Sequence, residues 1–271
     1  ALVREPEIPA RADLVLMEST YGNRDHRPLA ETLAELEGVL RDAKRDQGVV
    51  LMPAFAVGRT QELLFHLGCF WQLGKLEGWK VYLDSPMAIE VTRLYNQWLD
   101  ELDEQDQRAL RHFHARTLEE FLPVLALTPT VEDSIALNAI EHGAIIIAGS
   151  GMCNGGRIRH HLKHRLWREN THLVFAGFQA RGTLGRQLVD GAPWVRMFGQ
   201  RYAVRARIHT LGGFSAHAGR NGLLGWARAI QGRPAFRLVH GESEALKALA
   251  HALAAEGRDV TIAEPGSPFT F

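Results

Sequence analysis

The chain has 271 residues, enough for one large or two ordinary domains, and its 46% hydrophobic and 23% charged residues are typical of a globular protein. Lys and Arg together number 31, as do Asp and Glu, so the formal net charge is zero. A polyanion must therefore be bound by a local patch, because the field of the whole protein does not attract it.

The chain has few cysteines and no long apolar stretch. The two cysteines, Cys69 and Cys153, lie in unrelated contexts, which excludes a disulfide framework and a zinc knuckle built from cysteines. No stretch approaches the ~20 consecutive apolar residues of a membrane helix, and the first residues lack the pattern of a signal peptide. We therefore expect a cytoplasmic protein with no membrane partner.

Short apolar runs alternate with segments of helical periodicity. The runs predict buried strands at residues 13–17, 48–53, 81–83, 125–127, 144–148, 173–176, 236–239 and 260–262. The helical spacing predicts helices at residues 28–46, 60–67, 89–99, 100–115, 131–140, 157–168, 183–189, 218–230 and 244–256. Residues 194–198 and 202–208 alternate as the strands of an antiparallel ribbon do. The alternation of strands and helices, without a visible repeat, predicts an α/β fold with a mostly parallel sheet.

A carboxylate follows the first predicted strand. Glu18 comes directly after the apolar run and is followed by a polar turn that ends at Asn23. As a polar group at a strand end it is a candidate site residue. The alternative is that Glu18 caps the helix predicted to begin near Pro28.

Two histidines follow two later strands. His217 belongs to a polar elbow with Ser215, and His240 ends the apolar run 236–239. An α/β sheet binds its ligands beyond the carboxyl ends of its strands. A helical crossover between parallel strands would bring both histidines to the same edge of the sheet. The alternative is that each is a solvated or structural loop residue.

A glycine-rich turn links the strand 144–148 to the next helix. It contains Ser150, Gly151 and Met152, and the helix opens at about Arg157. Backbone N–H groups of such a turn and of a helix N-terminus favour an anion such as phosphate. The turn is not a Walker loop, because the Gly-Lys-Ser/Thr ending is absent.

The helix after this turn is densely basic. Its basic residues are Arg157, Arg159, His160, His161, Lys163, His164, Arg165 and Arg168. In a chain without net charge, this density predicts a contact with a nucleic-acid backbone. The alternative is a surface helix whose basic face is solvated.

Five stretches, in this order, resemble the β-CASP branch of the metallo-β-lactamase superfamily, a group of RNA-processing nucleases. They are Leu14–Gly22 (LVLMESTYG), Val81–Ala88 (VYLDSPMA), Ala148–Gly156 (AGSGMCNGG), Phe214–His217 (FSAH) and Leu238–Glu242 (LVHGE). The resemblance covers almost the whole chain. It implies part of an αββα metallo-β-lactamase domain, residues 1–27 and 204–271, with a β-CASP domain, residues 28–203, inserted between the two parts.

The resemblance also implies a role for each motif. Glu18 orients a neighbouring active-site group, His217 lies near the scissile phosphate and protonates the leaving oxygen, and His240 completes the coordination of one of two zinc ions. The resemblance places the loop of Ser150, Gly151 and Met152 beside the substrate cleft. Together with Ser215, and with Arg157 and Lys163 of the basic helix, these are the expected RNA contacts. The expected function is zinc-dependent hydrolysis of RNA.

The chain departs from the family at one signature. The His-x-His-x-Asp-His motif, which supplies most of the zinc ligands, is absent from these 271 residues. We therefore expect that the first half of the metallo-β-lactamase domain is missing, and that the 271 residues alone bind zinc weakly and cleave RNA poorly, because a catalytic zinc needs about three protein ligands. The alternatives are a non-catalytic RNA-binding module and a metallo-hydrolase of another substrate, such as an ester. A homodimer is left open.

Overall fold

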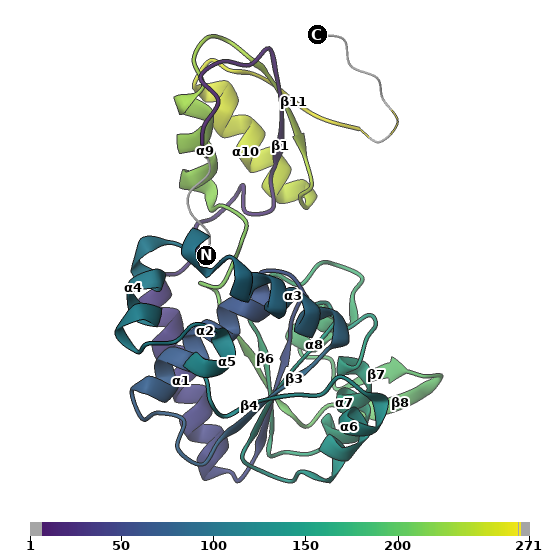
Figure 1. The fold of residues 1–271 in the computed structure, drawn as a ribbon. Helices are drawn as coiled ribbons and strands as arrows, with labels where there is room; N and C mark the ends of the chain where they lie inside the picture. The colour runs from purple at the N-terminus through teal and green to yellow at the C-terminus, as the bar shows by residue number, and fades with distance from the viewer. Residues whose placement is uncertain (1–6, 265, 267–271) are drawn as a thin grey trace. The chain divides into compact units, whose positions relative to one another are not determined.

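The computed structural model describes residues 7–264 and residue 266. They form two compact units, which are described separately (Figure 1). Unit 1 contains residues 27–215, and unit 2 contains the described residues before 27 and after 215. No helix in the described part of the chain is both long and apolar enough to cross a membrane.

Unit 1 is built on a six-stranded, wholly parallel sheet with the strand order β4-β3-β5-β2-β6-β9. The strands are β2 (Val49–Pro53), β3 (Lys80–Asp84), β4 (Leu125–Leu127), β5 (Ala144–Ala148), β6 (Thr171–Phe175) and β9 (Arg207–Thr210). All residues of β2, β5 and β6 are buried, as expected for central strands that are covered on both faces. The predicted α/β fold with a mostly parallel sheet is confirmed.

Helices pack on both faces of this sheet (Figure 1). Val50 and Met52 of β2 belong to one core, and Val49 and Leu51 belong to the other, because successive side chains of a strand point to opposite faces. The first core includes residues of α1 (Leu29–Arg45), α2 (Arg59–Gln72), α3 (Pro86–Gln97), α4 (Glu104–His112) and α5 (Leu118–Phe121). The second includes residues of α7 (Ile158–Arg165) and α8 (Leu184–Val189). The remaining helical segments of unit 1 are η1 (Leu99–Glu101), α6 (Val131–Ala136) and η2 (Leu137–Ala139).

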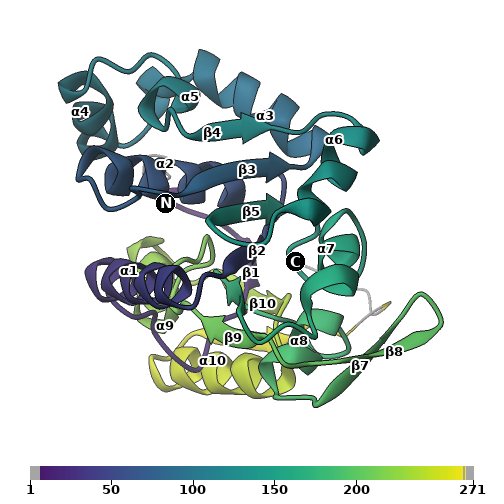
Figure 2. The same cartoon turned by 90° about the horizontal axis from the view of Figure 1, so that it is seen from below.

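An antiparallel hairpin, β7 (Trp194–Met197) and β8 (Gln200–Ala203), extends from unit 1 (Figure 2). The first part of the predicted ribbon is thus confirmed, but its continuation to residue 208 is wrong. The N–H groups of Arg205 and Ala206 both donate to Leu166 O, at 2.9 and 3.0 Å, and β9 then pairs in parallel with β6. The chain leaves the hairpin because these bonds redirect it to the edge of the six-stranded sheet.

This course also determines where the two units divide. They divide after Ser215, and the predicted domain boundary at residue 204 stays a prediction. Residues 204–215 belong to unit 1 because β9 is bonded to β6, and because Leu211 and Phe214 are buried in the first core.

Unit 2 contains a three-stranded parallel sheet of order β1-β10-β11. Its elements are β1 (Leu14–Glu18), α9 (Arg220–Ala229), β10 (Ala235–Val239), α10 (Ser243–Ala255) and β11 (Asp259–Ile262). Val15 and Met17 are buried with side chains of α9 and α10, but Leu16 between them is 59% exposed. The apolar run predicted a buried strand, whereas β1 is buried on one face only.

Candidate active site

Glu18 and His240 lie at the carboxyl ends of two neighbouring parallel strands. β1 and β10 pair with Glu18 opposite Val239, so His240 is the next residue beyond the strand. The N–H of Ser19 donates to His240 O at 3.2 Å. Gly241 is required here, because a Cβ atom at this position would lie 2.8 Å from Ser19 O. The two strand ends are therefore held together by backbone contacts.

His217 is positioned by the loop that follows β1. Nε2 of His26 lies 2.8 Å from His217 O, and Tyr21 forms a parallel bridge with Gly219. Both carboxylate oxygens of Asp25 accept hydrogen bonds from Asn221, one from its backbone N–H and one from its side chain, at 2.8 and 2.7 Å. A carboxylate is favourable at the N-terminus of a helix, so Asp25 fixes the start of α9 directly after the histidine.

Glu18, His217 and His240 converge. Their ligand-type atoms all lie within 4.8 Å of one another. Oε2 of Glu18 is 3.4 Å from Nδ1 of His217, and the two imidazole rings stack with centroids 5.2 Å apart. Glu18 also accepts the backbone N–H of Thr20 at 2.7 Å, while α1 has no side-chain cap. The alternative that Glu18 caps this helix is therefore wrong.

Thr20 contacts these three residues, and nothing in the sequence singled it out. Its Oγ1 lies 3.4 Å from Nδ1 of His217 and 3.2 Å from Nδ1 of His240, and it donates to His240 O at 3.2 Å. The only signal was its position two residues after Glu18 in the first motif. Thr20 is a positioning residue, because one hydroxyl contacts both imidazoles.

The converging atoms suit a metal ion. A carboxylate oxygen and imidazole nitrogens are donors that zinc accepts, so any of the three residues could contribute a ligand to a metal site. Among residues 7–264 and 266, no other group of three or more His, Cys, Asp or Glu side chains converges in this way. Glu18 and His217 are half-buried and His240 is exposed, so the group is accessible from solvent.

The glycine-rich turn of unit 1 folds back on itself. Ser150 N donates to Gly155 O at 3.2 Å, and Gly155 N donates to Oγ of Ser150 at 3.3 Å. A Cβ atom on Gly156, whose φ is +71°, would lie 2.2 Å from Gly149 O, and a Cβ atom on Gly151 would contact the ring of Phe55. The glycines thus serve close backbone approach.

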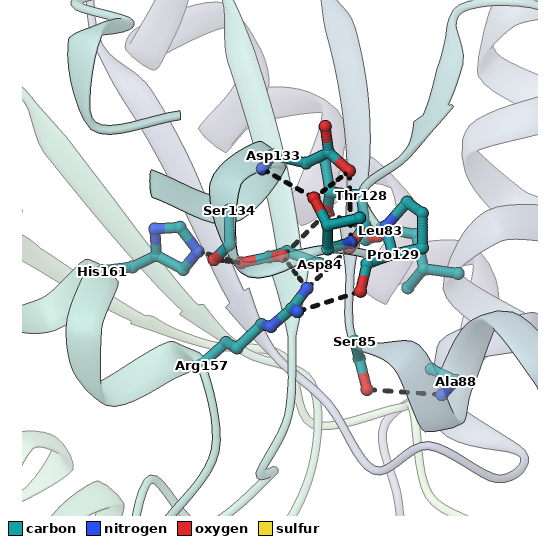
Figure 3. Close-up of polar contacts among 11 residues, drawn as sticks. Leu83, Asp84, Ser85, Ala88, Thr128, Pro129, Asp133, Ser134, Arg157 and His161 are labelled. Atoms are coloured by element: carbon teal, nitrogen blue, oxygen red, sulfur yellow. Dashed lines mark hydrogen bonds and ion pairs between the residues drawn. The ribbon is translucent and has the colours of Figure 1, made fainter. Parts of the chain in front are cut away.

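Arg157 is bonded within unit 1 (Figure 3). Its Nη1 donates to Oδ1 of Asp84 at 2.8 Å and to Thr128 O, and its Nη2 donates to Pro129 O at 3.1 Å. The guanidinium therefore joins the start of α7 to the end of β3 and to the loop after β4. These partners give Arg157 a structural role, and an RNA contact for it stays a prediction.

Asp84 is the centre of this network. It is fully buried, and its carboxylate also accepts hydrogen bonds from Thr128 and Ser134 and lies 2.6 Å from Nε2 of His161. Burial alone raises the pKa of Asp84, but the hydrogen bonds from His161, Ser134 and Thr128 outweigh it and hold the pKa at about 2.

The basic helix is divided between core and surface. His161 and Arg165 are buried, and Arg165 donates to the carbonyls of Leu137 and Ile140, whereas Lys163 is exposed. The basic residues therefore do not form one continuous RNA-binding face. Ser215 is the last residue of unit 1 and is half-buried. All six predicted RNA contacts lie in unit 1, and the converging group lies in unit 2.

Two family models match the chain. Residues 60–188 match the family model of the Beta-Casp domain, and residues 201–263 match that of the Zn-dependent metallo-hydrolase RNA specificity domain. Together these matches cover most of the chain, which belongs to the β-CASP branch of the metallo-β-lactamase superfamily.

Curated relatives carry names from RNA metabolism. The chain is 43% identical over 263 residues to Ribonuclease TTHA0252 of Thermus thermophilus, 32% over 243 residues to Transcription termination factor FttA of Pyrococcus abyssi, and 29% over 232 residues to RNase J-like protein of Methanocaldococcus jannaschii. These alignments cover 97%, 86% and 85% of the chain, but 59%, 37% and 52% of the relatives. The chain thus spans about three fifths or less of these relatives.

Proposed function

We propose that the protein is a zinc-dependent ribonuclease in which Glu18, His217 and His240 surround the scissile phosphate. The observation that carries this proposal is the convergence of their ligand-type atoms within 4.8 Å. A module that only binds RNA has no chemical need for a carboxylate and two imidazoles at one point. In this proposal, unit 2 is part of the metallo-β-lactamase domain and unit 1 is the β-CASP domain.

His240 is the proposed zinc ligand among these residues. Bound zinc would activate water and neutralise charge on the phosphate, and the complete site would hold two ions. Thr20 Oγ1, 3.2 Å from Nδ1 of His240, fixes the orientation of the ring. Such an outer partner of a metal-binding histidine raises its affinity for the metal.

His217 is the proposed general acid. Its Nδ1 faces Oε2 of Glu18 at 3.4 Å, which leaves Nε2 to give a proton to the departing sugar oxygen. The carboxylate stabilises the imidazolium that carries this proton, and it holds the ring in one orientation. The bond from His26 to the backbone of His217 restrains the same residue from the other side.

Unit 1 supplies the proposed RNA contacts. Ser150–Met152 would lie along the RNA backbone, with Ser215 near the phosphate, and Lys163 is exposed and available as a cation. Arg157 would act indirectly, because its bonds to Asp84 and Pro129 set the start of α7 next to this turn.

The proposal is tested by RNA cleavage in the intact, zinc-loaded protein. His217→Asn is expected to lower kcat by about 10²- to 10⁴-fold with little change in KM, because a general acid acts in the transition state. His251→Asn, an exposed histidine on α10, is the matched control. An unmodified protein that binds RNA without cleaving it would favour the RNA-binding module instead.

A further inference from the structure

The hairpin β7–β8 has one buried and one exposed face. Val195 and Met197 are buried in the second core of unit 1. Trp194 pairs with Ala203, and Arg196 pairs with Arg201, and directly opposed residues of an antiparallel pair share a face. All four of these residues are exposed. Figures 1 and 2 show the hairpin reaching out from the body of unit 1.

The exposed face concentrates positive charge. Two arginines lie directly opposite each other, and like charges in this arrangement destabilise a strand pair. In the described part of the chain, neither Arg196 nor Arg201 forms an ion pair with a carboxylate. Cζ of Arg201 lies 4.0 Å from the centroid of the Trp194 ring, so one cation is stacked on an aromatic side chain that is itself 46% exposed.

The tip of the hairpin continues this surface. Phe198 and Gly199 form the connection with φ values of +48° and +77°, and Phe198 is 45% exposed. A bulky residue rarely adopts a positive φ. Cζ of Arg159 lies 4.6 Å from the centroid of the Phe198 ring, and the ring centroids of His160 and Phe198 are 5.1 Å apart. Arg159 and His160 both belong to the first turn of α7. Aromatic rings and cationic groups therefore alternate from the hairpin to this helix.

We propose that the exposed face of β7–β8 binds single-stranded RNA, with bases stacked on Trp194 and Phe198 and phosphates held by Arg196 and Arg201. The proposal rests on the proposed ribonuclease function and adds a contact outside the glycine-rich turn. Unpaired bases stack on aromatic and guanidinium planes, and arginine binds phosphate in a fixed fork geometry. A polyanion also supplies the negative charge that the opposed arginines lack, in a chain whose net charge is zero.

The test is the salt dependence of binding between the intact protein and a fluorescently labelled uridine homopolymer. Removing two phosphate contacts with Arg196→Gln/Arg201→Gln is expected to reduce the slope of log affinity against log salt by about 1.4. Trp194→Leu is expected to weaken binding by about 5- to 100-fold without changing the slope, because stacking is not ionic. The control Arg41→Gln/Arg108→Gln removes two exposed arginines from α1 and α4 and should leave the slope unchanged.

Thermal unfolding separates this role from a structural one. Arg196→Gln/Arg201→Gln should change the unfolding temperature little, because the relieved repulsion between the two arginines offsets the lost stacking of Arg201 on Trp194. An unchanged slope and affinity in both hairpin variants, in a protein that does cleave RNA, would overturn the hairpin proposal alone and assign the surface to another partner, such as an acidic protein. A failure of the unmodified protein to bind or cleave RNA would overturn the proposed function as well.

Discussion

Oε2 of Glu18 lies 3.4 Å from Nδ1 of His217, although 198 intervening residues separate them in the chain. β1 delivers the carboxylate, and the loop before α9 delivers the imidazole. Their meeting depends on the parallel pairing of β1 with β10 and on the Tyr21–Gly219 bridge. In the proposed function the carboxylate and the imidazole act together as a general acid and its partner.

Replacing Glu18 with Gln keeps the size of the side chain and removes its charge. We expect kcat to fall by about 10- to 100-fold, because an amide does not stabilise the imidazolium of His217. Steady-state cleavage of a labelled RNA measures the change. Glu264→Gln, an exposed position of unit 2, should have no effect. Equal loss in both variants would show that net charge, and not the position of Glu18, matters.

Replacing Thr20 with Val removes the hydroxyl between the two imidazoles with little change in shape. We expect zinc affinity to fall by about 10- to 100-fold, because a metal-binding histidine loses its orienting partner. Competition with a chromophoric chelator measures this affinity. Thr20→Ser keeps a hydroxyl and should retain most of the affinity. Similar losses in Thr20→Val and Thr20→Ser would assign the effect to packing.

Replacing Asp84 with Asn breaks the buried network that Arg157 and His161 share. We expect the free energy of unfolding of unit 1 to fall by about 3–5 kcal/mol, because the Arg157 guanidinium and the His161 ring lose a buried charged partner. Urea denaturation followed by circular dichroism measures the change. Asp190→Asn, whose ion pair with Arg186 is exposed, should cost about 0–1 kcal/mol. A loss of that small size in Asp84→Asn would show that the network does not stabilise the unit.

Acid should destabilise unit 1 in two ranges. Burial lowers the pKa of His66 from 6.5 to about 4, so the unfolded chain takes up this proton first and stability falls between pH 6.5 and 4. The pKa of Asp84 is held at about 2 against 3.8, so its contribution is lost as pH falls from 3.8 towards 2. Urea titrations across pH 2–7 should show the first loss diminished in His66→Gln. An unchanged pH profile in that variant would contradict the assignment.

The sequence was most informative where the backbone alone decides the outcome. Apolar runs marked the strands, and a parallel sheet gathers the residues that follow its strands, so Glu18 and His240 could be selected as site residues. Thr20 could not be selected, because its contacts depend on the register that sets Glu18 opposite Val239. No local sequence pattern predicts the register between strands that are far apart in the chain.

Charge was the least informative signal. The basic residues of α7 predicted a surface contact. His161 and Arg165, four residues apart on one side of the helix, instead face the protein interior, where His161 contacts Asp84 and Arg165 donates to backbone carbonyls. Asp84 stood in a recognised motif, yet its partners come from the loop after β4, from α6 and from α7, which no spacing connects to β3. The departure of residues 207–210 from the hairpin likewise depends on Leu166 O, far away in the sequence.

Glu18 and His217 are proposed to act as one unit in RNA cleavage. A double-mutant cycle with Glu18→Gln and His217→Asn tests this coupling through single-turnover rates of the zinc-loaded, intact protein. Because residues that act as a unit have non-additive effects, we expect the double variant to be about as slow as His217→Asn alone. Losses that multiply in the double variant, or a single variant as fast as the unmodified protein, would show that the two residues do not act as a unit.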